Sequence, residues 1–92
     1  MALEFEWNDE KARLNPKKHS VGFEEATTVF GDTLSVTIAD PLHSDAEDRF
    51  VTTGISIQKR VLVVVFVERK GKIRIISARL ATKHERKIYE EK

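Results

Sequence analysis

Cysteine is absent from this 92-residue chain, which excludes disulfide bonds and thiolate zinc sites and suits a reducing compartment. A signal peptide is also lacking, because the N-terminal stretch MALEFEWNDE is acidic and has no apolar core segment. The longest apolar run, VLVVVFV at 61–67, is too short to cross a bilayer. We therefore expect one cytoplasmic domain over residues 1–92, with a modest core and no membrane contact.

Several motifs that mark known chemistries are missing as well. The sequence has no glycine-rich phosphate-binding loop, no nucleophile elbow and no H-E-x-x-H zinc motif. Its aromatic residues do not form the stacking signature of an RNA recognition motif. His43 lies in the acidic stretch PLHSDAED, but the ligand spacing there is poor and we assign this histidine to solvent. We predict neither a metal site nor a cofactor.

The net charge of +1 conceals a strong asymmetry between the two parts of the chain. Residues 1–57 carry 5 basic and 11 acidic side chains, a net charge of −6, whereas residues 58–92 carry 11 basic and 4 acidic ones, a net charge of +7. A basic C-terminal part can attract a polyanion such as nucleic acid. The alternative is that the two parts neutralise each other in the fold.

The N-terminal part predicts one strand and two helices. Residues 3–7 alternate as a strand, and Asn8 is an N-cap for a helix over 8–19, in which Pro16 favours a break near Asn15. The stretch FEEATTVF predicts a second helix over 23–30, which Gly31 ends.

Four consecutive strands and a last helix are predicted in the remainder of the chain. The strands span 33–40, 49–57, 60–69 and 73–79, with a loop at 41–48, a turn at 58–59 and a hairpin at 70–72 around Gly71. Thr82 and Glu85 form a capping box for a helix over 82–92. The order predicts an α+β fold in which helices pack on a four-stranded antiparallel meander. The predicted inward residues of the first two meander strands are Leu34, Val36, Ile38, Val51, Ile55 and Ile57.

The strand IRIISAR carries two arginines at positions where a small domain usually has apolar or neutral residues. If the strand is regular, Arg74 and Arg79 point to opposite faces, since they differ by five positions. With Arg49, which opens another strand, these arginines are candidates for binding phosphate in a bidentate manner. The alternative is that each is a solvated charge or an ion-pair partner, for example of Glu68, Glu47 or Asp48.

Histidine and tyrosine side chains offer further chemistry. His19 follows Lys17 and Lys18, so it is either a general acid or base beside a cation or a helix-C-terminal residue favoured by the dipole. His84 lies on the last helix and is expected to be exposed. Tyr89 either packs or presents its hydroxyl to a substrate.

Three blocks of the sequence resemble the BrnT family of bacterial toxins over nearly the whole chain. They are FEWNDEKARLNPKKHSVGFEEATTVF, DPLHSDAEDRF and VLVVVFVERKGKIRIISARLATKHERKIYEE, in the family's order and spacing. The positions that match the family motif are Trp7, Lys11, Asn15, Lys18, His19, Phe23, Glu24, Arg49, Gly54, Arg69, Arg74, Ser77, Arg79, Glu85 and Tyr89. Three departures are Asn8 in place of aspartate, KHSVGF in place of K-H-G-V-S-F, and Leu80 where lysine is common.

The resemblance implies a ribonuclease toxin of a type II toxin–antitoxin pair with a RelE-like fold. Its partner would be a BrnA-type antitoxin with a ribbon-helix-helix domain, and the complex would bind operator DNA to repress its own operon. RNA would be cut without a metal, with catalytic residues His19, Arg49, Glu68 and Arg79 and RNA-binding residues Lys11, Lys18, Arg69, Arg74 and Tyr89. The alternative is a non-catalytic binding module whose basic face docks an acidic partner or nucleic acid.

Overall fold

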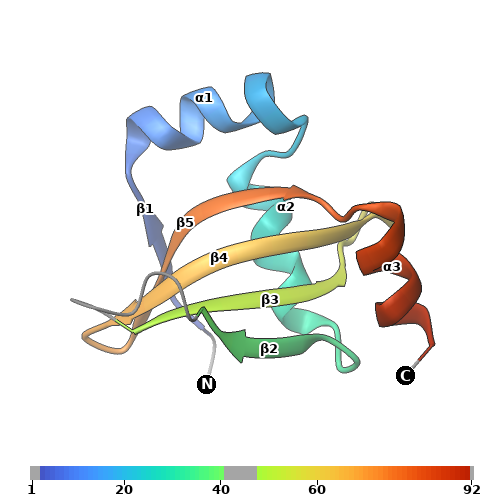
Figure 1. Ribbon diagram of the computed structural model, residues 1–92. Helices are drawn as coiled ribbons and strands as arrows, with labels where there is room; N and C mark the ends of the chain where they lie inside the picture. Colours follow the sequence, from blue (N-terminus) through green and yellow to red (C-terminus); the bar gives the residue numbers. More distant parts are fainter. Residues whose placement is uncertain (1–2, 41–47, 92) are drawn as a thin grey trace.

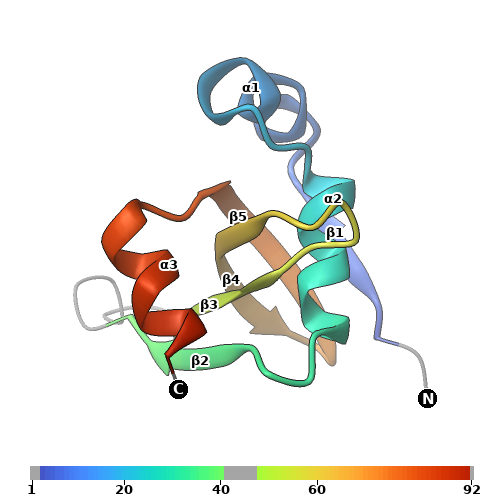
Figure 2. The ribbon, with the colours of Figure 1, turned by 90° about the vertical axis from the view of Figure 1, so that its right-hand side faces the viewer.

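A five-stranded sheet with helices on both faces organises the computed structural model, which describes residues 3–40 and 48–91. Figures 1 and 2 show α2 and α3 on opposite faces of the sheet and α1 beyond its upper edge. This arrangement confirms the predicted α+β class. The elements are β1 (Phe5–Trp7), α1 (Asp9–His19), α2 (Phe23–Thr28), the 3-10 turn η1 (Val29–Gly31), β2 (Val36–Ala39), β3 (Arg49–Ile55), β4 (Val61–Arg69), β5 (Lys72–Leu80) and α3 (Lys83–Glu90).

The strand order β1-β5-β4-β3-β2 contains the predicted meander and extends it by one strand. Strands β2 to β5 pair antiparallel in sequence order, whereas β1 pairs parallel with β5. The sheet therefore has five strands rather than four. Strand β1 joins because Phe5 and Trp7 pack into the core, where their rings lie 5.3 Å from Phe30 and 5.8 Å from Phe23. The β4–β5 hairpin turns at Lys70 and Gly71, which both have positive φ as its two-residue loop requires.

The core fills the space between the sheet and α2. Its sheet residues include Leu62, Val64, Phe66 and Ile75, and α2 and its flanks contribute residues such as Phe23 and Val29. No helix in the described ranges has the length and apolar character needed to cross a membrane.

The predicted inward side of β3 was wrong. Thr52, Gly54 and Ser56 are the buried residues, whereas Ile57 is 74% exposed. A glycine is needed at position 54 because a Cβ there would lie 2.9 Å from Val29 Cγ1. The strand therefore turns its small residues toward the crowded helical layer, and Val51 and Ile55 lie on the other face.

The inward assignment of β2 was also wrong. Leu34, Val36 and Ile38 are all exposed, and the strand is only four residues long at the edge of the sheet. The predicted loop at 41–48, including His43, lies outside the described residues except for Asp48.

Helix α1 runs through Pro16 without the predicted break and ends at Ser20, which has φ 62°. A proline in the last turn removes a single helical N–H, and the Ser20 amide still closes the turn on the Pro16 carbonyl at 2.9 Å. The buried Asn15 side chain donates to the carbonyls of Val21 and Ala78, both at 2.8 Å. Asn15 thereby fixes α1 against the part of β5 that β1 does not cover.

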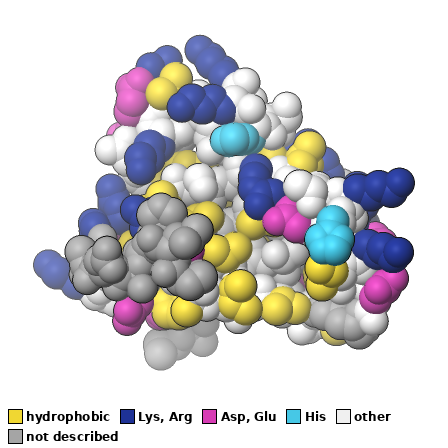
Figure 3. All heavy atoms as spheres, in the orientation of Figure 1, with side chains coloured by type: hydrophobic (Ala, Val, Ile, Leu, Met, Phe, Trp, Pro, Cys, Tyr) yellow, Lys and Arg dark blue, Asp and Glu magenta, His cyan; other side chains and the backbone are white. Residues whose placement is uncertain are grey.

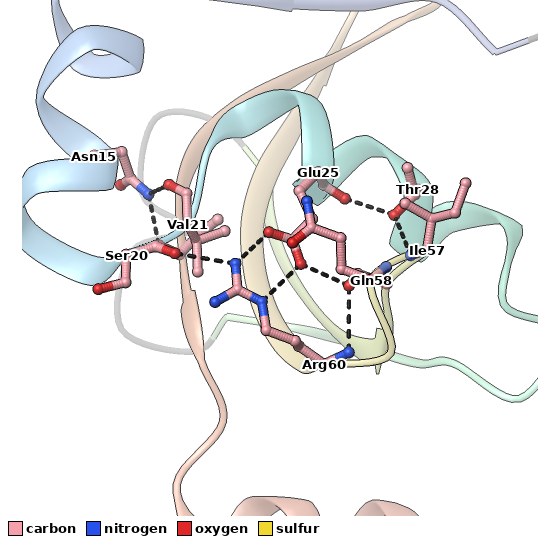
Figure 4. Close-up of polar contacts among 10 residues, drawn as sticks. Asn15, Ser20, Val21, Glu25, Thr28, Ile57, Gln58 and Arg60 are labelled. Atoms are coloured by element: carbon pink, nitrogen blue, oxygen red, sulfur yellow. Dashed lines mark hydrogen bonds and ion pairs between the residues drawn. The ribbon is translucent and has the colours of Figure 1, made fainter.

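A buried carboxylate joins three separate segments on the α2 side (Figure 4). Glu25 of α2 accepts from Ser56 Oγ at 2.6 Å and from Arg60 Nε at 3.0 Å, and Arg60 also donates to the Ser20 carbonyl at 3.0 Å. Hydrogen bonding from Arg60 is the main cause that lowers the pKa of Glu25, and it outweighs the opposing effect of burial. This network holds the end of α1, α2 and the β3–β4 turn together.

Replacing Glu25 tests this network. Glu25→Gln removes the charge that Arg60 pairs with, so we expect the free energy of unfolding to fall by about 1–3 kcal/mol in urea melts at pH 7. The exposed neighbour Glu24 is the control, and Glu24→Gln should change stability by less than about 0.5 kcal/mol. Because the folded pKa of Glu25 is lowered, its contribution is present above the unfolded pKa and is lost as pH falls through the folded value. The difference between wild type and Glu25→Gln should therefore shrink on acidification; equal stabilities at pH 7 would contradict the assignment.

Candidate functional site

A bulge in β5 puts the two arginines of IRIISAR on the same face of the sheet. Val65 pairs with Ser77 and Phe66 with Ile75, so Ile76 is an extra residue in β5. Beyond the bulge Arg79 lies opposite Val63, and before it Arg74 lies opposite Val67. Val63 and Val67 are four positions apart in β4 and share a face, so their partners do too. The expectation that Arg74 and Arg79 point to opposite faces was wrong, because it assumed a regular strand.

The side of the sheet that carries Arg49, Arg74, Ser77 and Arg79 is here called the arginine face, and it is the side that α3 covers in part. Arg49, Val67 and Arg74 form one row across β3, β4 and β5. The two arginines are thus about 10 Å apart at Cα, with one strand between them. Arg74 Nη1 donates to Glu6 Oε2 of β1 at 3.1 Å. Both arginines are half-buried, so sheet and neighbours restrict their motion.

Arg79 lies about 13 Å further along β5, counting four regular steps of strand rise. Its Nη1 and Nη2 donate to Glu85 Oε1 at 2.7 Å and to Oε2 at 2.9 Å, and Nη1 also donates to the Leu80 carbonyl at 3.3 Å. Hydrogen bonding from Arg79 lowers the pKa of Glu85 to about 2, and Glu85 in turn raises the pKa of Arg79. Within the described residues, these hydrogen bonds do not use the Nε–H and one Nη2–H of Arg79. The two groups point the same way and can donate together, as a side-on fork, to a second ligand.

A groove of about 180 Å³ between α1 and β5 opens beside Ser77. Ser77 lies on β5 between Arg74 and Arg79 and shares their face. The groove brings together the α1 residues predicted for RNA binding and catalysis, all of them exposed. Its lining residues are Lys11, Leu14, Asn15, Lys18, His19, Ile76 and Ser77.

Tyr89 attaches α3 to the sheet. Its hydroxyl donates to Asp32, whose carboxylate also accepts from the amides of Leu34 and Ile55 at 2.9 and 2.8 Å. Burial and the hydrogen bond to Asp32 raise the pKa of Tyr89 to about 12. Tyr89 was expected either to pack or to present its hydroxyl to a substrate. This contact corresponds to packing, because the hydroxyl is bound to the Asp32 carboxylate.

Of the two predicted site residues at the end of β4, Glu68 lies on the other side of the sheet, whereas Arg69, two positions from Val67, shares the arginine face. Glu68 and Arg69 are exposed at the end of β4 beside the hairpin, and Glu68 pairs with the core residue Ile73, which puts it on the α2 side. His84 is exposed on α3 as expected. Residues 3–40 and 48–91 contain no group of three His, Asp or Glu side chains placed to hold a metal ion.

Basic and hydrophobic side chains occupy different areas on this side of the molecule (Figure 3). Figure 3 shows basic side chains gathered over α1 and around α3, with hydrophobic side chains between and below them over the sheet. A polyanion would therefore find cations along two borders of the arginine face.

The carboxylates that hold the arginines were not identified from the sequence. Glu6 is a partner only because β1 pairs with β5, which no local pattern reveals. Glu85 could have been found, because the capping box puts it in the first turn of α3, six residues after Arg79.

Comparison with known proteins gives a family and a fold. The family model for the ribonuclease toxin BrnT of type II toxin–antitoxin systems matches residues 7–85. The crystal structure of the Brucella abortus ribonuclease toxin BrnT aligns with a TM-score of 0.65 at 19% identity, covering 89% of this chain and all of that one. No match was found among curated proteins. With a family match over most of its length and the same fold as a solved member, the chain belongs to the BrnT family of type II toxin–antitoxin ribonuclease toxins.

Proposed function

We propose that residues 1–92 act as one toxin domain that cuts RNA internally, in the cytoplasm, by attack of the RNA's own 2′-OH. The observation that carries this proposal is the arginine face, where three strand-borne arginines share one side of the sheet. Two of them, Arg74 and Arg79, flank Ser77, which lines the α1 groove with His19, Lys11 and Lys18. Because RNA supplies the nucleophile, the reaction needs no metal.

The chemistry requires three tasks. The 2′-OH loses its proton as O2′ attacks phosphorus, the pentacovalent phosphorane dianion is stabilised, and the P–O5′ bond breaks as O5′ gains a proton. The products are a 2′,3′-cyclic phosphate and a 5′-hydroxyl. Fixed arginines perform the second task without reorganising, and such donors contribute about 2.7–4 kcal/mol each in other enzymes.

Arg79 is the principal phosphate ligand in this proposal. Glu85 holds the guanidinium through two hydrogen bonds, and the side-on fork of Arg79 remains for two phosphate oxygens. Arg49 stabilises the phosphorane from its own row, and Arg74, held by Glu6, binds a neighbouring part of the backbone.

Proton transfer is assigned to His19. Imidazole is the side chain that ordinarily changes charge near neutral pH, and the His19 groove adjoins the arginine face at Ser77. Glu85 is a poor base because its pKa is about 2. Glu68 has no part in this mechanism, since it lies on the α2 side of the sheet.

The remaining cations bind the RNA backbone, and a protein partner suppresses the activity. Lys11 and Lys18 extend the phosphate-binding surface from α1, and Arg69 extends it toward the hairpin. The partner is a BrnA-type antitoxin with a ribbon-helix-helix domain, and operator DNA is bound only through the complex. The family membership supports this pairing.

Cleavage in excess EDTA tests the reaction. Purified protein incubated with RNA and EDTA should produce fragments with 2′,3′-cyclic phosphate ends, identified by mass spectrometry, because no step uses a metal. The Arg79→Ala protein, purified in parallel, controls for contaminating nucleases. Activity that disappears with EDTA and returns with Mg²⁺ would refute the mechanism, and absence of cleavage under all conditions would favour the non-catalytic binding module.

Substitution of Arg79 separates a phosphate ligand from a structural ion pair. Arg79→Ala removes charge and fork, and Arg79→Lys keeps only the charge, so both should relieve growth inhibition, alanine more than lysine. Both should stay folded, with stability changed by at most about 1 kcal/mol, because the pair with Glu85 is partly exposed. Growth after induction and thermal melting measure the two effects, and Arg86→Ala on exposed α3 surface is the control. A folded Arg79→Ala protein as toxic as the parent would show that Arg79 is only an ion-pair partner.

A further inference from the structure

Strand β2 is an edge of the sheet that no other strand of the described ranges, 3–40 and 48–91, pairs with on its outer side. Its four residues, Val36–Ala39, are all exposed and include no charged residue and no proline. Natural proteins usually protect such an edge with charges, proline, a bulge or a covering element, because it is a template for pairing with another strand. None of the first three devices is present in β2.

The ladder with β3 fixes which backbone groups of β2 face outward. The Asp40 amide donates to the Arg49 carbonyl at 2.8 Å, and in an antiparallel ladder such pairs recur at every second residue. Val36 and Ile38 therefore bond to β3. The amides and carbonyls of Thr37 and Ala39 point away from the sheet and are available to a further strand.

An apolar groove accompanies this edge on the arginine face. Val36 is 41% exposed, and Ile38 of β2 and Ile88 of α3 are each 58% exposed. Between β2, β3 and α3 lies a groove of about 360 Å³. Val36, Thr53, Glu85, Ile88 and Tyr89 line it, so it can receive apolar side chains from a strand paired with β2.

We propose that the antitoxin neutralises this toxin by adding a strand to β2, with alternate apolar side chains in the groove and acidic residues toward α3. This inference rests on the proposed function for the identity of the partner. Lys83 and Lys87 are exposed cations on the side of α3 away from the groove residues Glu85 and Ile88, so an acidic segment meets them where it continues past the groove and over the helix. Glu85 lines the groove and holds Arg79, so a segment bound there lies against the principal phosphate ligand.

A second copy of this chain fits the edge less well. Pairing two four-residue β2 strands buries little surface against the roughly 1,200 Å² of a stable interface. A longer antitoxin segment can cover both β2 and the groove beside α3, and so bury more surface.

Two substitutions probe the edge in different ways. Ile38→Lys places a charge next to the exposed apolar side chain of Val36, beside the groove. Ala39→Pro removes an outward N–H without removing a ladder bond to β3, and proline is tolerated at edge strands. Ile57→Lys is the matched control, because Ile57 is also an exposed isoleucine but lies beyond the end of β3, near α2. The probe is the cognate antitoxin, titrated by calorimetry against each purified toxin, with RNA cleavage measured in parallel.

Ile38→Lys and Ala39→Pro should each raise the antitoxin Kd by about tenfold or more, whereas Ile57→Lys should change it by less than about twofold. All three should cut RNA at the parental rate, so binding and catalysis are read separately. Strand addition would be overturned if Ile38→Lys left the antitoxin affinity unchanged. It would also be overturned if Ile38→Lys reduced the affinity but Ala39→Pro did not. A free toxin that dimerises until Ile38→Lys is introduced would assign the edge to a second copy and equally overturn it. Loss of cleavage in the parent would refute the ribonuclease proposal while leaving the affinity test intact.

Discussion

The extra residue in β5 is the constraint on which the arrangement of charge depends. Without Ile76, the positions after it would be shifted by one, and Arg79 would point to the α2 side, into the layer that α2 and the core occupy. With it, Arg79, Ser77 and Arg74 line one side of a single strand. The bulge lies in mid-strand, beside Val65 and Phe66, where β4 is buried and its own register is fixed. One inserted residue thus converts an alternating strand into one that carries its cations together.

Much of the architecture follows from local pattern, and the residues show why. The starts of α1 and α3 are set by the capping residues Asn8 and Thr82, and the Lys70–Gly71 turn is set by its backbone conformation. The sequence contains a partial signal for the bulge, because the adjacent residues Ile75 and Ile76 interrupt the alternation of IRIISAR. The direction of Arg79 could not be predicted from this signal, since a bulge is defined by its pairing with β4.

The incorrect predictions concern residues whose surroundings depend on contacts between separate helices and strands. Alternation in β2 and β3 correctly predicted strands but placed the wrong side inward, because Thr52 and Gly54 are small enough to lie under η1 while β2 is an edge. The partners of the arginines were sought in neighbouring strands and acidic loops. They come instead from β1 and α3, and Glu6 is 68 positions away from Arg74. Likewise, the burial of Glu25 next to the exposed Glu24 depends on the position of Arg60 in the fold.

The parallel pairing of β1 with β5 has a consequence for how the molecule is made. Residues 5–7 are synthesised well before residues 73–75, with which they form the parallel ladder. Contacts of such long sequence separation form slowly, because a large loop must close before they contribute. Glu6 reaches Arg74 only through this pairing, so the arginine face is not complete until β5 has been synthesised and has paired with both β4 and β1. The cationic surface is therefore absent from the nascent chain until that point.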